Sequence, residues 1–101
     1  MQQSYVYIMS SKPNGAIYVG VTSNIVKRIW QHKTAMCDGF TKKYNVRQLV
    51  YFEIHQDISE AIIREKRIKK WRRNWKCQLI EKSNPQWRDL YNDIIGLADP
   101  L

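Results

Sequence analysis

Two β-rich runs on either side of a tight-turn sequence constrain the fold of this chain most strongly. Residues 5–9 (YVYIM) and 16–21 (AIYVGV) flank the sequence PNG at 13–15. Proline, asparagine and glycine favour tight turns, and Asn-Gly is a strong hairpin signal. The pattern therefore predicts an antiparallel hairpin. Because side chains alternate between the faces of a strand, we expect Tyr7 and Tyr18 to lie close together across it.

The remaining sequence predicts one further strand and several helices. Asp57 and Glu60 have the spacing of a capping box at the start of a long helix. In that helix an apolar stripe is expected at Ala61, Ile68, Trp75 and Leu79. The predicted order after the hairpin is a short helix at 25–33, a loop with local helix at 35–48, a strand at 49–54, a long helix from Ile58 to about Lys82 and a short helix at 86–95. The predicted fold class is α+β, a small three-stranded antiparallel sheet flanked by helices in the order β-β-α-β-α-α, forming one domain over residues 1–101.

The charge of the chain favours a polyanionic partner. The 101 residues carry a net charge of +8, which suits nucleic acid or an anionic membrane surface. The sequence has no apolar run of roughly 20 residues, as a membrane span requires, and no signal-peptide pattern at its start. Cys37 and Cys77 are far apart, and we expect both to be free thiols in a reducing cytosol. These features favour a cytoplasmic protein that binds nucleic acid rather than a membrane.

The predicted long helix carries a face of one charge. Between Glu60 and Glu81 the only acidic residue is Glu65. The basic residues of this segment include Arg64, Lys66, Arg67, Lys69, Lys70, Arg72, Arg73 and Lys76. A solvated surface helix is one interpretation, but bases that do not alternate with acids suit phosphate binding better than pairing along the helix.

Glu65 is the most specific candidate on this helix, because it is expected at the edge of the apolar stripe. One interpretation is an ion pair with Arg72, which projects to the same side. The other is a metal ligand, since Mg²⁺ often uses one or two protein carboxylates and takes its other ligands from water and phosphate. The pattern of residues leaves both open.

Tyr7, Tyr18, Arg28 and His32 are further candidates around the predicted hairpin and first helix. The two tyrosines can equally be core aromatics, and Arg28 with His32 can equally be a surface pair. Both residues nevertheless flank Ile25 on one side of the predicted helix, so their side chains can reach the same neighbourhood.

Taken in order, these residues resemble a known family. YVY at 5–7, YVG at 18–20, the helix TSNIVKRIWQHK and the segment EAIIREKRIKKWRR are similar to the motifs of the GIY-YIG nuclease superfamily. The ending SNPQWRDLY looks like the small stand-alone bacterial members, the YhbQ-like (UPF0213) group. Tyr5 replaces the glycine and Val19 the isoleucine of the family name, at positions that support the strands.

The resemblance implies metal-dependent hydrolysis of phosphodiester bonds. It implies that Tyr7, Tyr18, Arg28, His32 and Glu65 are catalytic, with Glu65 holding one Mg²⁺ or Mn²⁺ and Arg28 binding the scissile phosphate. Tyr7 would orient or deprotonate the attacking water. Because a free tyrosine has a pKa of about 10, His32 or a hydroxide on the metal remain alternatives as the base. The expected substrate-binding residues are Arg64, Lys69, Lys70, Arg72, Arg73 and Asn84.

The resulting hypothesis is an endonuclease of low sequence specificity in DNA repair or nucleic-acid processing. The chain has no room for a separate recognition domain, so single-stranded, flexible or branched DNA is the expected substrate, with RNA left open. A partner protein could supply specificity, and the one-signed surface favours a monomer. The alternatives are a catalytically inactive nucleic-acid-binding module and a protein-interaction domain for an acidic partner.

Overall fold

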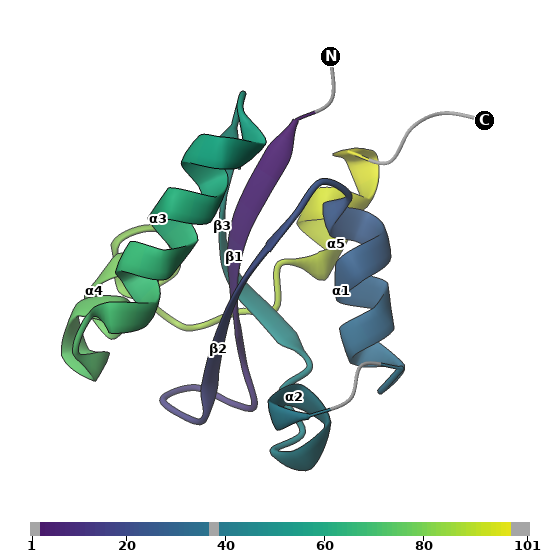
Figure 1. Cartoon of the computed structure of the whole chain (residues 1–101). Coiled ribbons are helices and arrows are strands. Elements are labelled where there is room, and N and C mark those ends of the chain that lie inside the picture. Colours follow the sequence, from purple (N-terminus) through teal and green to yellow (C-terminus); the bar gives the residue numbers. More distant parts are fainter. Residues whose placement is uncertain (1–2, 37–38, 98–101) are drawn as a thin grey trace.

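The computed structural model describes residues 3–36 and 39–97, in which a three-stranded antiparallel sheet lies between two layers of helices (Figure 1). Strand β1 (Ser4–Ser10) is central, with β2 (Ile17–Thr22) on one side and β3 (Gln48–His55) on the other. The register places Tyr7 opposite Gly20 of β2 and Phe52 of β3. The predicted hairpin and fold class are confirmed.

The hairpin forms because its turn residues accept the required backbone angles. Asn14 adopts a left-handed φ of 59°, which asparagine tolerates better than most residues. The amide of Gly15 donates to the carbonyl of Lys12 at 2.9 Å and closes the turn. This turn sets the register of β1 against β2, and hence the position of every side chain that the hairpin contributes to the site.

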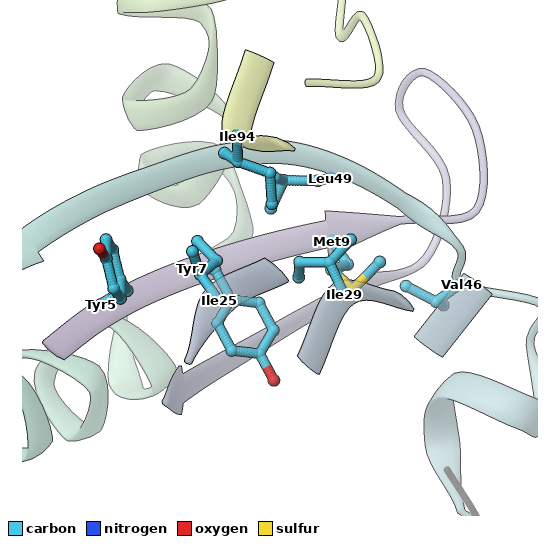
Figure 2. Packing of buried hydrophobic residues seen from close by; sticks show 8 residues of the cluster. All are labelled: Tyr5, Tyr7, Met9, Ile25, Ile29, Val46, Leu49 and Ile94. Atoms are coloured by element: carbon cyan, nitrogen blue, oxygen red, sulfur yellow. The ribbon is translucent and has the colours of Figure 1, made fainter. Parts of the chain in front are cut away.

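Alternation along β1 divides the core into two clusters, one on each face of the sheet. One cluster contains Tyr5, Tyr7, Met9, Ile25, Ile29, Val46, Leu49 and Ile94 (Figure 2). The other contains Val6, Ile8, Val19, Val50, Ala61, Ile68, Ile80 and Trp87. Burying both faces of so small a sheet supplies the apolar contacts that hold the helices in place.

The first face is covered by α1 (Ile25–Lys33) and α5 (Tyr91–Ile94), with the short helix α2 (Phe40–Lys43) at one end of the sheet (Figure 1). The side chain of Asn24 caps α1 by accepting a hydrogen bond from the amide of Lys27 at 3.2 Å. Helix α1 therefore begins where the sequence predicted it.

The opposite face is covered by α3 (Ile58–Lys70) and α4 (Arg73–Ser83), so the prediction of one helix to Lys82 was wrong. Trp71 and Arg72 between them are extended, with ψ of 149° and 156°. The chain turns there so that Ile80 of α4 is buried in the second cluster, and tertiary packing overrides the local helical preference. Trp75 consequently leaves the predicted apolar stripe and is 48% exposed.

The predicted helix at 86–95 was too long. Trp87 has a positive φ of 57°, which is incompatible with a right-handed helix, and its ring is buried in the second cluster. The helix α5 begins only at Tyr91 and continues as a 3₁₀ turn over Ile95–Leu97. No helix within the described parts of the chain is both long and apolar enough to cross a membrane. Cys77 is a free thiol, whereas Cys37 lies outside the described residues.

Candidate active site

Tyr7 reaches from the central strand to the β2 side of the sheet because Gly20 lies beside it. Tyr7 and Gly20 are paired in the register, and a Cβ on Gly20 would overlap the Cζ and Oη atoms of Tyr7. Gly20 has ordinary strand backbone, so its role is steric clearance rather than conformational freedom. Figure 2 shows the Tyr7 hydroxyl pointing away from Leu49 and Ile94.

Two polar side chains of α1 meet the Tyr7 hydroxyl. His32 Nε2 lies 3.0 Å from Tyr7 Oη, and Arg28 Nε donates to the same oxygen at 3.4 Å. His32 and Arg28 are four residues apart, so they project from one side of α1. Tyr7 is fully buried and Arg28 is half-buried, so the contact between them lies at the boundary between the core and the surface.

His32 is held as a neutral imidazole. Burial, followed by the positive charge of Arg28, lowers its pKa from 6.5 to about 4. His32 is 3% exposed, and its Nδ1 has no hydrogen-bond partner among residues 3–36 and 39–97. A neutral imidazole has one donor and one acceptor nitrogen, so Nε2 is able to accept the Tyr7 proton. The arrangement can transfer a proton between the two residues.

Tyr18 completes a triangle of rings. Its centroid lies 6.3 Å from that of Tyr7 and 5.6 Å from that of His32, and the Tyr7 and His32 centroids are 5.7 Å apart. These distances are typical of packed aromatic pairs. The predicted neighbourhood of Tyr7, Tyr18, Arg28 and His32 is therefore present in the structure.

Glu65 is linked to this triangle through Lys69. Lys69 Nζ lies 3.1 Å from Glu65 Oε2, one turn away on α3, and 5.8 Å from the centre of the Tyr18 ring. The Glu65 side chain is 12% exposed, whereas that of Lys69 is 48% exposed. The cation paired with Glu65 is thus Lys69, where the sequence suggested Arg72. Arg72 lies beyond the break in the helix and contacts the Trp75 ring instead.

The donor set around Glu65 suits a hard cation that keeps most of its water. Within the described residues no three His, Cys, Asp or Glu side chains converge on one point, as a structural zinc site would require. A single carboxylate is compatible with Mg²⁺ or Mn²⁺, because these ions take most of their other ligands from water and phosphate oxygens. The site can hold such an ion only together with substrate or solvent ligands.

Three of the predicted substrate-binding residues make hydrogen bonds within the protein. Asn84 is buried, and its amide donates to the carbonyls of Val50 and Arg88 at 3.0 and 2.8 Å. Arg73 donates to two carbonyls of the hairpin turn. Arg64 binds the carboxylate of Glu53 at 3.0 and 3.3 Å. Asn84 therefore offers little surface to a substrate, whereas Lys70, Arg72 and Arg73 are exposed.

The cluster around Glu53 was not anticipated from the sequence. Its carboxylate also accepts from Tyr51 Oη and lies beside His55 Nε2, each at 2.6 Å. Burial acts to raise the pKa of Glu53, but hydrogen bonds from Arg64, Tyr51 and His55 hold it below its ordinary value. Burial and the neighbouring carboxylate raise the pKa of Tyr51 to about 12. The cluster joins β3 to α3 and does not include the catalytic candidates.

The space that Gly20 leaves for the Tyr7 ring was also not predicted from the sequence. A signal for it was present, since the hairpin register alone places Gly20 opposite Tyr7. A residue without a side chain beside a tyrosine in the same sheet indicates that the ring crosses that position.

Comparison with known proteins identifies the family. The GIY-YIG catalytic domain matches residues 3–78. A UPF0213 protein of Clostridium perfringens is 40% identical over 81 residues, which cover 80% of this chain and 86% of that protein. A UPF0213 protein of Staphylococcus saprophyticus is 38% identical, covering 81% of this chain and 99% of that protein. The solution structure of a UPF0213 protein from Bacillus halodurans superposes with a TM-score of 0.54 at 25% identity, covering 86% of this chain and 92% of that chain. The chain therefore belongs to the GIY-YIG catalytic domain family, among its UPF0213 members.

Proposed function

We propose that this protein is a metal-dependent endonuclease that hydrolyses phosphodiester bonds of DNA with low sequence specificity. The observation that carries the proposal is the contact of one buried hydroxyl, Tyr7 Oη, with both a neutral imidazole and a guanidinium. A fold that only binds nucleic acid has no need of this arrangement below its surface. Membership of a nuclease superfamily supports the same reaction class.

Arg28 and Lys69 are the proposed phosphate ligands. Arg28 presents a planar set of donors that matches two phosphate oxygens, and Lys69 Nζ lies 5.8 Å from the centre of the Tyr18 ring. A bound phosphate would draw the Arg28 guanidinium away from Tyr7, which opens the hydroxyl to a water molecule. Both cations would then stabilise the negative charge that grows on the phosphate during attack.

Tyr7 and His32 are the proposed proton-transfer pair. The water oxygen forms a bond to phosphorus while its proton passes to Tyr7 Oη, and the Tyr7 proton passes to His32 Nε2. The bond from phosphorus to the 3′ oxygen breaks, and solvent protonates that oxygen. When Arg28 moves to the phosphate, one of the two causes of the low His32 pKa is removed. Binding of substrate therefore makes His32 a better base at the moment it is needed.

Glu65 would hold one Mg²⁺ or Mn²⁺ beside the scissile phosphate. The ion would supply neutralisation of charge on the phosphate and the leaving oxygen. Because Glu65 is paired with Lys69, metal and lysine compete for the carboxylate. Transfer of Lys69 to a substrate phosphate would free Glu65, so substrate and metal are expected to bind cooperatively.

The proposed substrate is DNA with unpaired or flexible segments, in the cytoplasm, in repair or processing. The surface cations Lys70 and Arg72 can contact phosphates but cannot by themselves distinguish bases. We propose that the protein acts as a monomer, with any sequence preference supplied by a partner protein.

The deciding experiment is a cleavage assay with labelled single-stranded DNA, duplex DNA and RNA, each with Mg²⁺, Mn²⁺ or EDTA. Glu65→Ala is the test variant. Glu60→Ala is its matched control, since Glu60 lies exposed on the first turn of the same helix. We expect metal-dependent cutting that Glu65→Ala abolishes and Glu60→Ala retains.

Absence of cutting on every substrate by folded protein would contradict the proposal. Salt-sensitive binding without cutting would identify the protein as an inactive nucleic-acid-binding module. Equal activity of the two variants would remove Glu65 from the metal site.

A further inference from the structure

A row of aromatic rings leads from the site onto the surface of α2. The Tyr18 and Phe40 centroids are 6.4 Å apart with an interplanar angle of 28°, and the Phe40 and Tyr44 centroids are 4.7 Å apart. Tyr18 belongs to the ring triangle with Tyr7 and His32. The row therefore begins at the proposed reaction centre and ends in solvent.

The two outer rings, Phe40 and Tyr44, belong to neither core cluster. Phe40 is 43% and Tyr44 47% exposed. Helix α2 is instead attached through Thr41, which is buried and accepts a hydrogen bond from the amide of Val46 at 2.8 Å. Single exposed apolar residues are common on proteins, but here three neighbouring rings, with interplanar angles of 28° and 44°, lie beside the proposed reaction centre.

Positive charge lies at both ends of the row. Lys43 Nζ is 5.3 Å from the centre of the Tyr44 ring, and Lys69 Nζ is 5.8 Å from the centre of the Tyr18 ring. Aromatic faces combined with flanking cations are the features by which proteins bind single-stranded nucleic acid, since bases stack on the rings and phosphates lie along the cations.

We propose that Phe40 and Tyr44 form a stacking platform for an unpaired nucleobase next to the scissile phosphate. The proposal rests on the nuclease function above, and it commits the α2 surface to nucleic acid rather than to a protein. An unpaired base is required because both faces of a base inside a duplex are already stacked. The platform accounts for a preference for unpaired substrate without any base-specific hydrogen bonds.

The test compares two probes in EDTA, so that no cleavage occurs. One is a fluorescein-labelled single-stranded oligothymidylate, and the other is an oligomer of equal length made of abasic sites, which keeps the phosphates and lacks the bases. Fluorescence anisotropy gives the Kd of each. The test variant is Phe40→Ala/Tyr44→Ala.

The double variant should bind the oligothymidylate about fivefold to 100-fold more weakly, which is the range for loss of base stacking. Its Kd for the abasic oligomer should stay within about twofold of the unmodified protein's. Phe40→Trp/Tyr44→Trp should restore the preference for bases, because tryptophan provides a stacking face. Circular dichroism and thermal unfolding check that each variant is folded.

Trp30→Ala is the matched control. Trp30 is 48% exposed and lies two residues after Arg28, hence roughly 160° from it around α1. This substitution should leave both Kd values unchanged. The stacking site would be overturned if the α2 double variant bound both oligomers more weakly by the same factor, or if it kept the preference for the oligothymidylate. It would also be overturned if Trp30→Ala lost as much affinity for the oligothymidylate as the double variant.

The two proposals fail in different ways. If the protein bound the oligothymidylate more tightly than the abasic oligomer but cleaved no substrate, the proposed nuclease function would be contradicted and the stacking site would stand. If the protein cleaved DNA with a metal and the double variant kept its preference for bases, the nuclease function would stand and the stacking site would be contradicted.

Discussion

Tyr7 Oη and His32 Nε2 lie 3.0 Å apart, although the two residues are 25 positions apart in the chain. One comes from the central strand and the other from the helix that packs on it, and both are buried. A phenol and a neutral imidazole buried in contact with each other form a pair whose proton can move without exchange with bulk water.

Tyr7→Phe removes the hydroxyl and keeps the ring in the core. We expect loss of cleavage rate by about 100-fold or more, in the range for loss of a proton-transfer group. Single-turnover cleavage at saturating substrate measures the effect. Tyr5→Phe is the control, because Tyr5 lies on the same strand and face but its hydroxyl bonds to Gln3. A rate for Tyr7→Phe within threefold of the unmodified protein would exclude Tyr7 from the chemistry.

Gly20→Ala places a methyl group where the Tyr7 ring crosses β2. The ring must shift, so we expect a cleavage rate reduced by about tenfold or more, with a loss of roughly 1–3 kcal/mol in the free energy of unfolding from overpacking. Gly96→Ala is the control, since a Cβ there meets no atom within 4 Å. Full activity of folded Gly20→Ala would show that the clearance does not position Tyr7.

Arg28→Lys keeps the charge and removes the planar set of donors. We expect a rate loss of about tenfold for Arg28→Lys and about 100-fold for Arg28→Ala, because the alanine also loses the charge that stabilises the transition state. Lys27→Ala removes the same charge from a neighbouring exposed position of α1 and should change the rate by less than threefold. If Arg28→Lys cleaved as fast as the unmodified protein, bidentate binding of the phosphate by Arg28 would be contradicted.

His32 makes stability depend on pH between about 6.5 and 4. Its pKa is about 4 in the folded protein and 6.5 when unfolded, so within this window the unfolded chain binds more protons. The free energy of unfolding should fall by about 2 kcal/mol from this group between pH 7.5 and 5. Urea unfolding of the unmodified protein and of His32→Gln checks this, since the variant should lack that part of the pH dependence. Parallel curves for the two proteins would contradict the buried neutral imidazole.

Glu53→Gln removes the charge that Arg64, Tyr51 and His55 share. Because the carboxylate is 17% exposed, we expect a loss of about 1–3 kcal/mol in the free energy of unfolding, with an unchanged cleavage rate at saturating substrate. Asp93→Asn breaks the exposed pair with Arg88 and should have a much smaller effect on stability. If Glu53→Gln lowered the cleavage rate, the Glu53 cluster would have a role in the cleavage reaction.

Local patterns predicted the parts of the fold and site that depend on local geometry. The Pro-Asn-Gly turn and the two-residue period of strands were sufficient to bring Tyr7 near Tyr18. The four-residue spacing of Arg28 and His32 was sufficient to place both on one side of α1. These inferences use neighbours along one chain segment, where backbone geometry leaves few alternatives.

The break at Trp71 and Arg72 was not predictable in the same way. Neither residue is a glycine or proline, and the chain leaves the helix there because Ile80 and Trp87 must reach the second core cluster. Once the helix ends, a helical wheel no longer relates Glu65 to Arg72, so the interpretation of Glu65 as the partner of Arg72 lost its geometric basis. Lys69, one turn from Glu65 on an unbroken helix, is the partner that local geometry permits. The contacts of Phe40 with Tyr18 join distant segments and carry no pattern in the sequence.

The position of β1 between two partner strands has a consequence for how the site fluctuates. Its backbone amides are hydrogen-bonded on both sides, so they should exchange with solvent deuterium only when the whole sheet opens. Helix α2, with its four residues and few buried side chains, can open at a much smaller free-energy cost. Tyr7, on β1, is therefore expected to leave its position only when the protein unfolds as a whole. The α2 surface, which is proposed to hold the substrate, can open and reclose while the rest of the protein stays folded.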